Sequence, residues 1–144
     1  MTDLLFTYGT LMRGIPSKYA ERLLQASDFL GEARVAGRLY DLGRYPGLIS
    51  DPRSNKQVTG HIYKLKHPRT RLKQIDAYEG IIASIPTEQQ EYSRIVVPVA
   101  HASGSLYCWA YVWKQFRPGT PEISGYYPDY WQSNERHRLF TQSS

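Results

Sequence analysis

Short apolar stretches, rather than long amphipathic repeats, dominate the pattern of hydrophobic and polar positions along this chain. Residues that are apolar in short runs, or that alternate with polar residues, predict β-strands at 4–7, 29–40, 58–65, 92–100 and 106–113. Gly31 and Gly37 interrupt the second segment, so we expect a bulge or a bend there. Gly104 lies in the short polar segment between the last two strands, which predicts a β-hairpin. Pro98 cannot donate a ladder hydrogen bond, so we expect it to face an edge or a bulge.

Two other segments carry apolar residues at helical spacing. A short amphipathic helix is predicted at 18–26, with Ser17 as its N-cap. A second helix is predicted from Pro68 to about Tyr78, and Gly80 is placed to end it. Because strands outnumber helices, we expect an α+β fold built on an antiparallel sheet that can curl into a barrel.

The remaining segments are predicted to form a turn at 45–47 and a C-terminal tail from about residue 117. Tyr45-Pro46-Gly47 is turn chemistry, followed by a brief apolar run. From about residue 117 the chain is rich in proline and tyrosine, and we expect the polar end of this aromatic C-terminal tail to fray. We find no internal repeat or linker, so a single domain over residues 1–144 is expected.

Composition places this domain in a broad class. The chain has 144 residues, of which 41% are hydrophobic, and this is enough to build a core. Its one cysteine, Cys108, cannot form an internal disulfide, and no apolar run approaches the roughly 20 residues of a membrane span. Asp3 stands where a signal peptide would carry a base. We therefore expect a cytoplasmic protein that does not associate with a membrane.

The formal net charge of +5 raises the question of a nucleic-acid partner. The basic residues are scattered in small groups, for example at 69–73 and at 136–138, and neither group is interleaved with aromatic residues in an RNA-binding motif. A basic, solvated surface explains this distribution better, so no nucleic-acid partner is expected. Such a surface also favours an anionic small molecule.

The second predicted helix carries an acid on its apolar face. Leu72, Ile75, Asp76 and Glu79 lie at positions i, i+3, i+4 and i+7, so they share one stripe. Leu72 and Ile75 must face the core, and Glu79 therefore leaves the end of the helix pointing inward. Burial and the negative end of the helix dipole would both raise the pKa of this carboxyl, which could then exchange a proton near neutral pH. Alternatively, the helix ends one residue earlier and Glu79 turns out to water.

A second candidate site follows the first predicted strand, at Tyr8-Gly9-Thr10-Leu11. A glycine in this position lets the backbone turn tightly and expose consecutive N–H groups, which can hold a carboxylate or an oxyanion. The alternative is an ordinary turn at the end of a strand.

Tyr92 and Arg94 alternate onto one face of their predicted strand, so the phenol and the guanidinium project together. They could contact a substrate, or Arg94 could form an ion pair with Glu79 or Asp76. An arginine near a buried acid most often pairs with it, so we favour the structural role for Arg94.

Other kinds of chemistry find little support in the sequence. The histidines show no metal-ligand spacing; they are His61, His67, His101 and His137. Cys108 lies within a predicted strand, where a small buried hydrophobic residue is usual. Phosphate-binding, dinucleotide-binding and nucleophile-elbow motifs are absent from the sequence. We therefore expect neither a metal nor an organic cofactor.

Several short motifs follow one another in a specific order between Leu4 and Trp113. A first strand leads into Tyr8–Gly14, a strand at Gly60–Leu65 precedes Ile75–Gly80, and Tyr92–Arg94 opens the hairpin. Taken together, this order resembles the gamma-glutamylcyclotransferase-like superfamily, particularly its gamma-glutamylamine cyclotransferases and uncharacterised bacterial members.

This resemblance implies a small mixed, mainly antiparallel β-barrel flanked by short helices. It also implies that the Tyr8–Leu11 loop holds a substrate through its backbone N–H groups, and that Glu79 is the general acid/base. By the same resemblance, Tyr92 and Arg94 line or brace the site.

The reaction implied by the resemblance is an internal acyl transfer of the lyase type. The α-amine of a small gamma-glutamyl amine or peptide attacks its own γ-carbonyl, which releases 5-oxoproline and a free amine. Because both reacting groups belong to one molecule, orientation supplies much of the rate, and no cofactor is needed.

Two features depart from the expected pattern of this superfamily. The segment 80–91 is longer than expected and could form a lid or an altered wall, and the aromatic tail has no clear counterpart. These departures leave the leaving group of the substrate open. An alternative function also stays open, namely a non-catalytic small-molecule binding protein on the same fold.

Overall fold

The computed structural model describes residues 2–142 and contains every strand that the hydrophobic pattern predicts. The strands are β1 (Leu4–Thr7), β2 (Ser27–Asp41), β3 (Pro46–Ser50), β4 (Gln57–Leu65), β5 (Tyr92–His101), β6 (Gly104–Trp113) and β7 (Glu122–Ile123). The turn expected at Tyr45-Pro46-Gly47 lies slightly earlier, because β3 already begins at Pro46. The chain reverses between Leu42 and Tyr45, where the Leu42 N–H donates to the Tyr45 carbonyl at 3.0 Å.

Both predicted helices are present. Helix α1 (Lys18–Gln25) begins after Ser17, whose hydroxyl accepts a hydrogen bond from the backbone N–H of the third residue of the helix. Helix α2 (Pro68–Tyr78) has the predicted bounds, and the chain leaves it through Gly80, whose φ of 79° suits a glycine. The remaining helical segments are the short 3₁₀ turn η1 (Thr87–Gln89), α3 (Tyr127–Ser133) and α4 (Glu135–Gln142). None of the helices within residues 2–142 has the length and apolar character that crossing a membrane requires.

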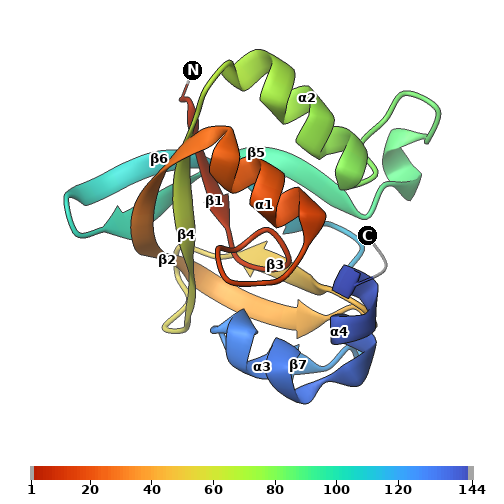
Figure 1. Cartoon of the computed structure of the whole chain (residues 1–144). Helices are drawn as coiled ribbons and strands as arrows, with labels where there is room; N and C mark the ends of the chain where they lie inside the picture. The colour runs from red at the N-terminus through yellow and green to blue at the C-terminus, as the bar shows by residue number, and fades with distance from the viewer. Residues whose placement is uncertain (1, 143–144) are drawn as a thin grey trace.

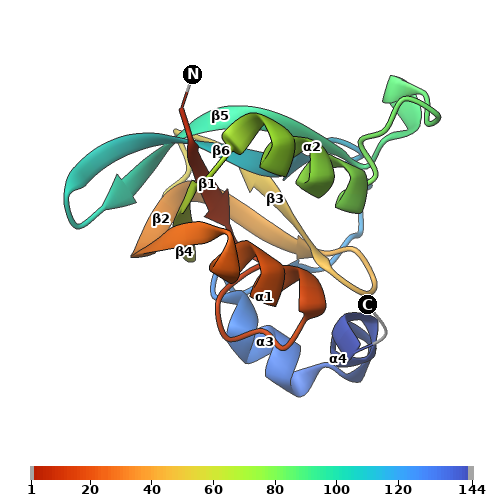
Figure 2. The same cartoon turned by 45° about the horizontal axis from the view of Figure 1, so that its top comes forward.

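Five strands close into a barrel (Figures 1 and 2). Strands β1, β4, β2, β3 and β6 are hydrogen-bonded in this order, and β6 pairs again with β1 to complete the ring. Most neighbouring pairs are antiparallel, but β6 runs parallel to β1 at Leu5–Trp109 and parallel to β3 at Leu48–Val112. The expected α+β class and the mixed, mainly antiparallel barrel flanked by helices are therefore confirmed.

Local irregularities occur where the sequence predicts them. The register of β2 against β4 shifts between Phe29 and Gly31, and the φ of Gly31 is 98°. The hairpin of β5 and β6 turns through Gly104, at φ 119°. Pro98 is exposed and lies in a part of β5 that pairs with β6 alone, which agrees with the expected edge position.

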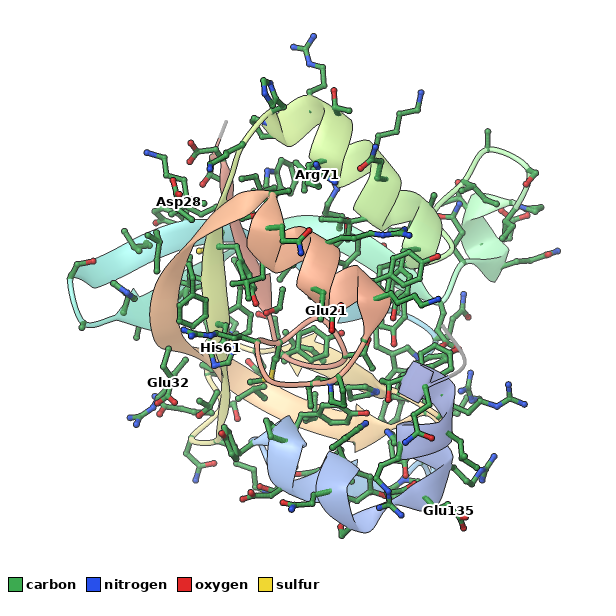
Figure 3. All side chains as sticks on the ribbon, viewed as in Figure 1. Glu21, Asp28, Glu32, His61, Arg71 and Glu135 are labelled. Carbon is green, nitrogen blue, oxygen red and sulfur yellow. The ribbon has the colours of Figure 1, made fainter. Side chains whose placement is uncertain are left out.

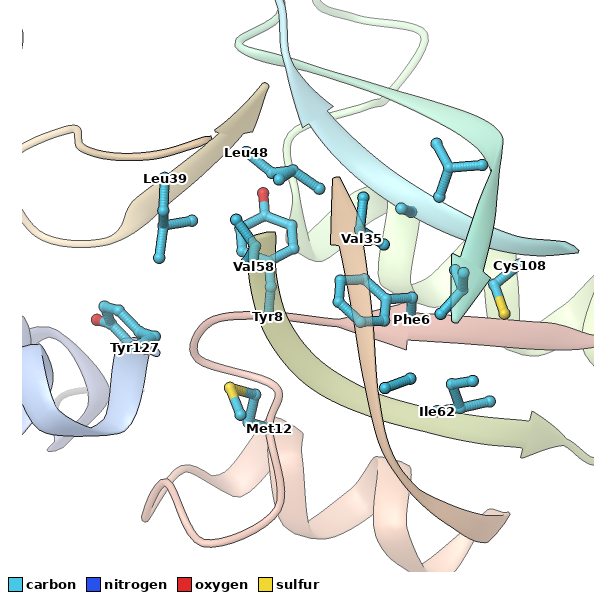
Figure 4. Packing of buried hydrophobic residues seen from close by; sticks show 14 of the residues in the cluster. Phe6, Tyr8, Met12, Val35, Leu39, Leu48, Val58, Ile62, Cys108 and Tyr127 are labelled. Carbon is cyan, nitrogen blue, oxygen red and sulfur yellow. The ribbon is translucent and has the colours of Figure 1, made fainter. Parts of the chain in front are cut away.

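Two apolar clusters lie on opposite faces of the strands. The first fills the barrel and includes Phe6, Val35 and Cys108 (Figure 4). The second lies outside the barrel wall, under α1 and α2, and includes Leu5 and Leu72. Leu5 and Phe6 are adjacent in β1 and both are almost fully buried, one in each cluster. Burial of both faces explains why β1 is an uninterrupted apolar run rather than an alternating one.

The C-terminal segment packs on the barrel and is helical as far as Gln142, so the expectation that its polar end frays was wrong for this part; residues 143–144 lie outside the described residues. Helix α3 places Tyr127 within the barrel cluster, fully buried. From α4, the buried His137 contacts Asp41 through Nε2 at 2.7 Å and the Tyr127 hydroxyl through Nδ1 at 2.7 Å. The Tyr130 hydroxyl donates to the other Asp41 oxygen. These polar groups satisfy one another, and the segment can therefore be buried despite its polar sequence.

The close approach of β4 to β1 predicts a strict requirement for glycine at position 60. A Cβ atom at Gly60 would lie 2.2 Å from the carbonyl oxygen of Thr7, a backbone atom that cannot rotate away. We expect Gly60→Ala to lower the free energy of unfolding by about 3 kcal/mol or more, measured by urea denaturation.

Gly31→Ala is the matched control, because nothing lies within 4 Å of a Cβ at that position and only its positive φ opposes the change. This variant should lose about 1–2 kcal/mol. Equal losses in the two variants would contradict a steric role for Gly60.

Candidate active site

A cavity of about 380 Å³ lies where several chain segments meet beside the barrel. It is lined by the end of β1 and the loop after it, the C-terminus of α2, the segment before β5, the start of β3 and one residue of α4. Six of the seven predicted site residues line it: Tyr8, Gly9, Thr10, Leu11, Glu79 and Tyr92. The seventh, Arg94, lies outside the lining.

The loop after β1 lines this cavity and contains backbone N–H groups that have no internal acceptor. The Met12 N–H donates to the Gly9 carbonyl at 3.0 Å, which closes a tight turn. Within residues 2–142, the N–H groups of Gly9, Thr10 and Leu11 have no acceptor. A Cβ at Gly9 would lie 2.7 Å from the Pro46 ring, so glycine allows the loop to pack directly against β3. Consecutive N–H groups that converge on one point can bind an anionic oxygen.

Glu79 stands at the C-terminal end of α2, on the face that the helical spacing predicts. Leu72 and Ile75 of the same face are buried, and the Glu79 N–H still donates to the Ile75 carbonyl at 2.9 Å. Glu79 is therefore the C-cap residue directly after the last residue of α2, and this half-buried residue lines the cavity. Burial, together with the negative charges of Asp76 and Glu91, raises the pKa of the Glu79 carboxyl to about 8.

Three tyrosine hydroxyls fix the walls of the cavity. The Tyr8 hydroxyl donates to the Tyr111 carbonyl at 2.6 Å, and the Tyr92 hydroxyl donates to the Pro46 carbonyl at 2.6 Å. The Tyr78 hydroxyl lies 3.1 Å from the Thr10 hydroxyl and joins the end of α2 to the loop after β1. Burial raises the pKa of Tyr78 to about 12, so this phenol stays protonated at neutral pH.

Arg94 pairs with an acid, and the acid is Asp76 rather than Glu79. Its Nε lies 2.7 Å from Asp76 Oδ1, and one terminal nitrogen lies 3.2 Å from Oδ2. The Tyr111 hydroxyl donates to the same Oδ1 at 2.7 Å. The guanidinium carbon stands 4.2 Å from the centre of the Trp109 ring. This arrangement ties α2 to β5 and β6, in agreement with the structural role favoured for Arg94.

The sequence reasoning missed several residues that line the cavity. Glu91, directly before β5, supplies a second carboxylate, and its Oε1 is buried without a hydrogen-bond partner within residues 2–142. Tyr45 and Phe140 form another part of the wall, with ring centres 5.1 Å apart. Glu91 lies directly before a predicted strand, but nothing in the neighbouring sequence indicates that its carboxyl meets the loop after β1. No local signal marked Tyr45 or Phe140, which meet only in the folded chain.

None of the histidines lines this cavity. The Nδ1 atom of His61 accepts from the Arg13 N–H at 3.1 Å, and His137 is paired with Asp41. Among residues 2–142, no three His, Cys, Asp or Glu side chains are grouped closely enough to hold a metal ion.

The raised pKa of Glu79 makes protein stability depend on pH. The folded protein keeps a proton on this carboxyl between about pH 4.5 and 8, whereas the unfolded chain releases it. The free energy of unfolding that the protonated carboxyl contributes is therefore complete below pH 4.5. It falls as the pH rises from 4.5 to about 8, by about 1.4 kcal/mol for each pH unit. We expect Glu79→Gln, which cannot ionise, to be more stable than the wild type at pH 9, and to gain much less at pH 5.

Urea denaturation of both proteins at the two pH values measures this difference. The exposed Glu88 of η1 does not line the cavity, so Glu88→Gln should show no such pH-dependent gain. A gain for Glu79→Gln that is equal at pH 5 and pH 9 would contradict a buried, protonated Glu79.

The chain is similar to known proteins both in sequence and in fold. Residues 5–133 match the protein family described as "Gamma-glutamyl cyclotransferase, AIG2-like". The chain is 32% identical over 117 residues to a Vibrio cholerae protein named "Putative gamma-glutamylcyclotransferase", and the match covers 80% of this chain and 85% of that protein.

Solved structures share the fold. An AIG2-like protein from Mus musculus has a TM-score of 0.64 at 24% identity, covering 84% of this chain and 85% of that one. YtfP from Escherichia coli has a TM-score of 0.56 at 27% identity, covering 85% and 93%. YkqA from Bacillus subtilis has a TM-score of 0.68 at 23% identity; the similarity covers 94% of this chain but only 44% of YkqA, so this chain spans less than half of its length. The family match over 5–133, together with the Vibrio cholerae relative, shows that the chain belongs to the AIG2-like gamma-glutamyl cyclotransferase family.

Proposed function

We propose that this protein is a gamma-glutamyl cyclotransferase-type enzyme, which converts a small gamma-glutamyl amine or peptide to 5-oxoproline and a free amine. The observation that carries the proposal is that the Glu79 carboxyl, with a pKa raised to about 8, shares one cavity with the unpaired N–H groups of the loop after β1. Family membership supports the reaction class.

The α-carbon of a gamma-glutamyl group carries an ammonium and a carboxylate, and the cavity has polar groups that complement both. The N–H groups of Gly9, Thr10 and Leu11 can hold the α-carboxylate or, at a later step, the oxyanion formed from the γ-carbonyl. Glu91 lines the same cavity and its negative charge attracts the α-ammonium, as does Glu79 in its ionised form. The volume of about 380 Å³ lies within the usual range for a small-molecule site, about 300–1,000 Å³.

The proposed reaction moves one proton through Glu79. In its ionised form, Glu79 takes a proton from the α-ammonium, and the free amine attacks the γ-carbonyl carbon to close a five-membered ring. The tetrahedral intermediate then breaks its bond to the leaving nitrogen, which receives the proton from Glu79. The ring nitrogen gives up its second proton as it becomes the lactam N–H, and this proton ends on the released amine, which leaves as its ammonium form. Ring closure forms one C–N bond and breaks another, so the chemistry balances without a cofactor. The raised pKa lets one carboxyl act in both directions near neutral pH.

Tyr92 and Arg94 have positioning roles in this proposal. Tyr92 holds the start of β3 through the Pro46 carbonyl. Arg94 holds Asp76, one turn before Glu79, and so fixes the end of α2. The segment before β5 contributes Ile85, Gln89, Gln90 and Glu91 to the wall, and we place the leaving group beside it.

Replacement of Glu79 tests the proposed acid/base. The purified protein would be incubated with a panel of gamma-glutamyl amines and dipeptides, and 5-oxoproline would be measured by mass spectrometry. We expect product from at least one substrate, and a loss of at least about 100-fold in kcat for Glu79→Gln, because acid–base catalysis is worth about 10²–10⁴-fold.

Glu88→Gln again provides the control and should keep full activity, since it removes an exposed acid from the same region. Folding of each variant would be checked by circular dichroism. Full activity in Glu79→Gln would refute the assigned role. Substrate binding without product in the wild type would favour the non-catalytic binding protein instead.

The pH dependence of kcat/KM provides a second test. Glu79 must be ionised to accept the proton, so kcat/KM should rise about tenfold per pH unit below pH 8 and then level off. Glu91→Gln removes one of the negative charges that raise this pKa, and the rise should therefore move to lower pH. The substrate amine titrates identically in both assays, so the difference between the profiles isolates the enzyme group. Superimposable midpoints would argue against Glu79 as the titrating residue.

A further inference from the structure

A second cavity, of about 370 Å³, lies between helices α1 and α2. Its lining comes from Tyr19, Arg22 and Leu23 of α1, and from Arg71, Gln74, Ile75 and Tyr78 of α2, together with Leu11. Leu11 and Tyr78 also line the first cavity, so these two side chains form a shared wall. Glu79 lines the first cavity and not the second, so the second cavity has no part in the proposed proton transfer.

The second cavity is basic. Arg22 and Arg71 both line it, its lining contains no carboxylate, and neither arginine forms an ion pair within residues 2–142. Glu21 directly precedes Arg22 on α1 but does not belong to the lining. Figure 3 shows Arg71 in the space between the ribbons of α1 and α2. Two unpaired guanidinium groups at one cavity give it a positive potential that no acid of the lining cancels.

Arg71 also carries an unused hydrogen-bond donor. One of its terminal nitrogens donates to Gln74 Oε1 at 2.8 Å, but its Nε is buried without an acceptor within residues 2–142. An unsatisfied buried donor costs about 1–3 kcal/mol, more when the group is charged, so such groups in folded proteins call for an explanation. Arg71 lines the cavity, and the terminal nitrogens of a guanidinium can hold the carboxylate or phosphate of a ligand there with parallel hydrogen bonds.

The rest of the lining is apolar or aromatic. Leu11, Leu23 and Ile75 are buried and form an apolar surface. The Tyr19 and Tyr78 rings lie 4.2 Å apart between their centres, and the Arg22 guanidinium stands over Tyr19 at 5.7 Å. A bare inorganic ion would leave this apolar surface uncovered, whereas an organic anion would cover it.

We propose that this cavity is a second ligand site, which binds a small organic anion separately from the Glu79 cavity. The anionic group, a carboxylate or a phosphate monoester, binds Arg71 and Arg22, and the apolar body of the ligand packs on Leu23, Ile75 and the tyrosine rings. Bound there, the ligand contacts Tyr78, the residue directly before Glu79, and so reaches the end of α2 from the side opposite to the substrate.

Calorimetric titration of the full chain tests this site with defined probes at constant ionic strength. Phenyl phosphate and phenylacetate carry the two kinds of anionic group on an aromatic body, inorganic phosphate lacks the body, and benzyl alcohol lacks the charge. We expect at least one of the two aryl anions to bind, and to bind at least tenfold more tightly than inorganic phosphate or benzyl alcohol. Whichever aryl anion binds more tightly identifies the anionic group.

Substitution of the two lining arginines then tests whether the anion binds in the second cavity. Arg71→Gln and Arg22→Gln should each weaken binding at least tenfold, since a hydrogen bond to a charged group contributes about 1.5–3 kcal/mol. Arg69→Gln removes the same charge from an exposed position of α2 outside the lining and should leave the affinity unchanged. Because Arg22 is exposed, its replacement gives a reading even if Arg71→Gln destabilises the fold.

Glu79→Gln separates this site from the proposed active site and should not change the affinity for the aryl anion. Failure of both aryl anions to bind, or wild-type affinity in both arginine variants, would overturn the second site while leaving the proposed reaction intact. Loss of binding in Glu79→Gln would assign the anion to the first cavity and would overturn it equally.

Discussion

The parallel pairing of β1 with β6 is the constraint on which the rest of the structure depends. β1 has only four residues, yet it closes the barrel by pairing with β4 on one side and with β6 on the other. The absence of a side chain at Gly60 allows this closure. Once β1 is fixed, the loop that follows it must pass beside Tyr111 and Pro46, where Tyr8 and Gly9 contact them. The candidate active site is therefore a product of barrel closure.

A second interaction determines where α2 ends relative to that loop. Asp76 is held by Arg94 from β5 and by Tyr111 from β6, so the last turn of α2 cannot slide along the barrel wall. A partly buried ion pair of this kind adds little net stability, but it specifies position. Its charge also helps to keep a proton on Glu79. Asp76 thus both fixes the position of Glu79 and raises its pKa.

The sequence predicted those features that depend on neighbouring residues. The bounds of α2 and the inward direction of Glu79 follow from helical spacing within one segment, and the bulge at Gly31 follows from a glycine in a strand. Features built from distant residues were beyond such reasoning. Asp41 and His137 are both polar, and nothing local to either one indicates that they meet in the interior. For the same reason the tail was expected to fray, and Glu91 was not singled out.

The position of Phe140 has a consequence for how relatives of this protein can diverge. It contributes to the wall of the candidate active site, yet it lies beyond residues 5–133, the part of the chain that matches the family. The barrel, the loop after β1 and Glu79 all fall within the shared part, whereas one wall of the cavity does not. Phe140 can therefore change without altering the loop after β1 or Glu79, so the C-terminal helix offers a way to reshape one side of the cavity independently of the proposed acid/base.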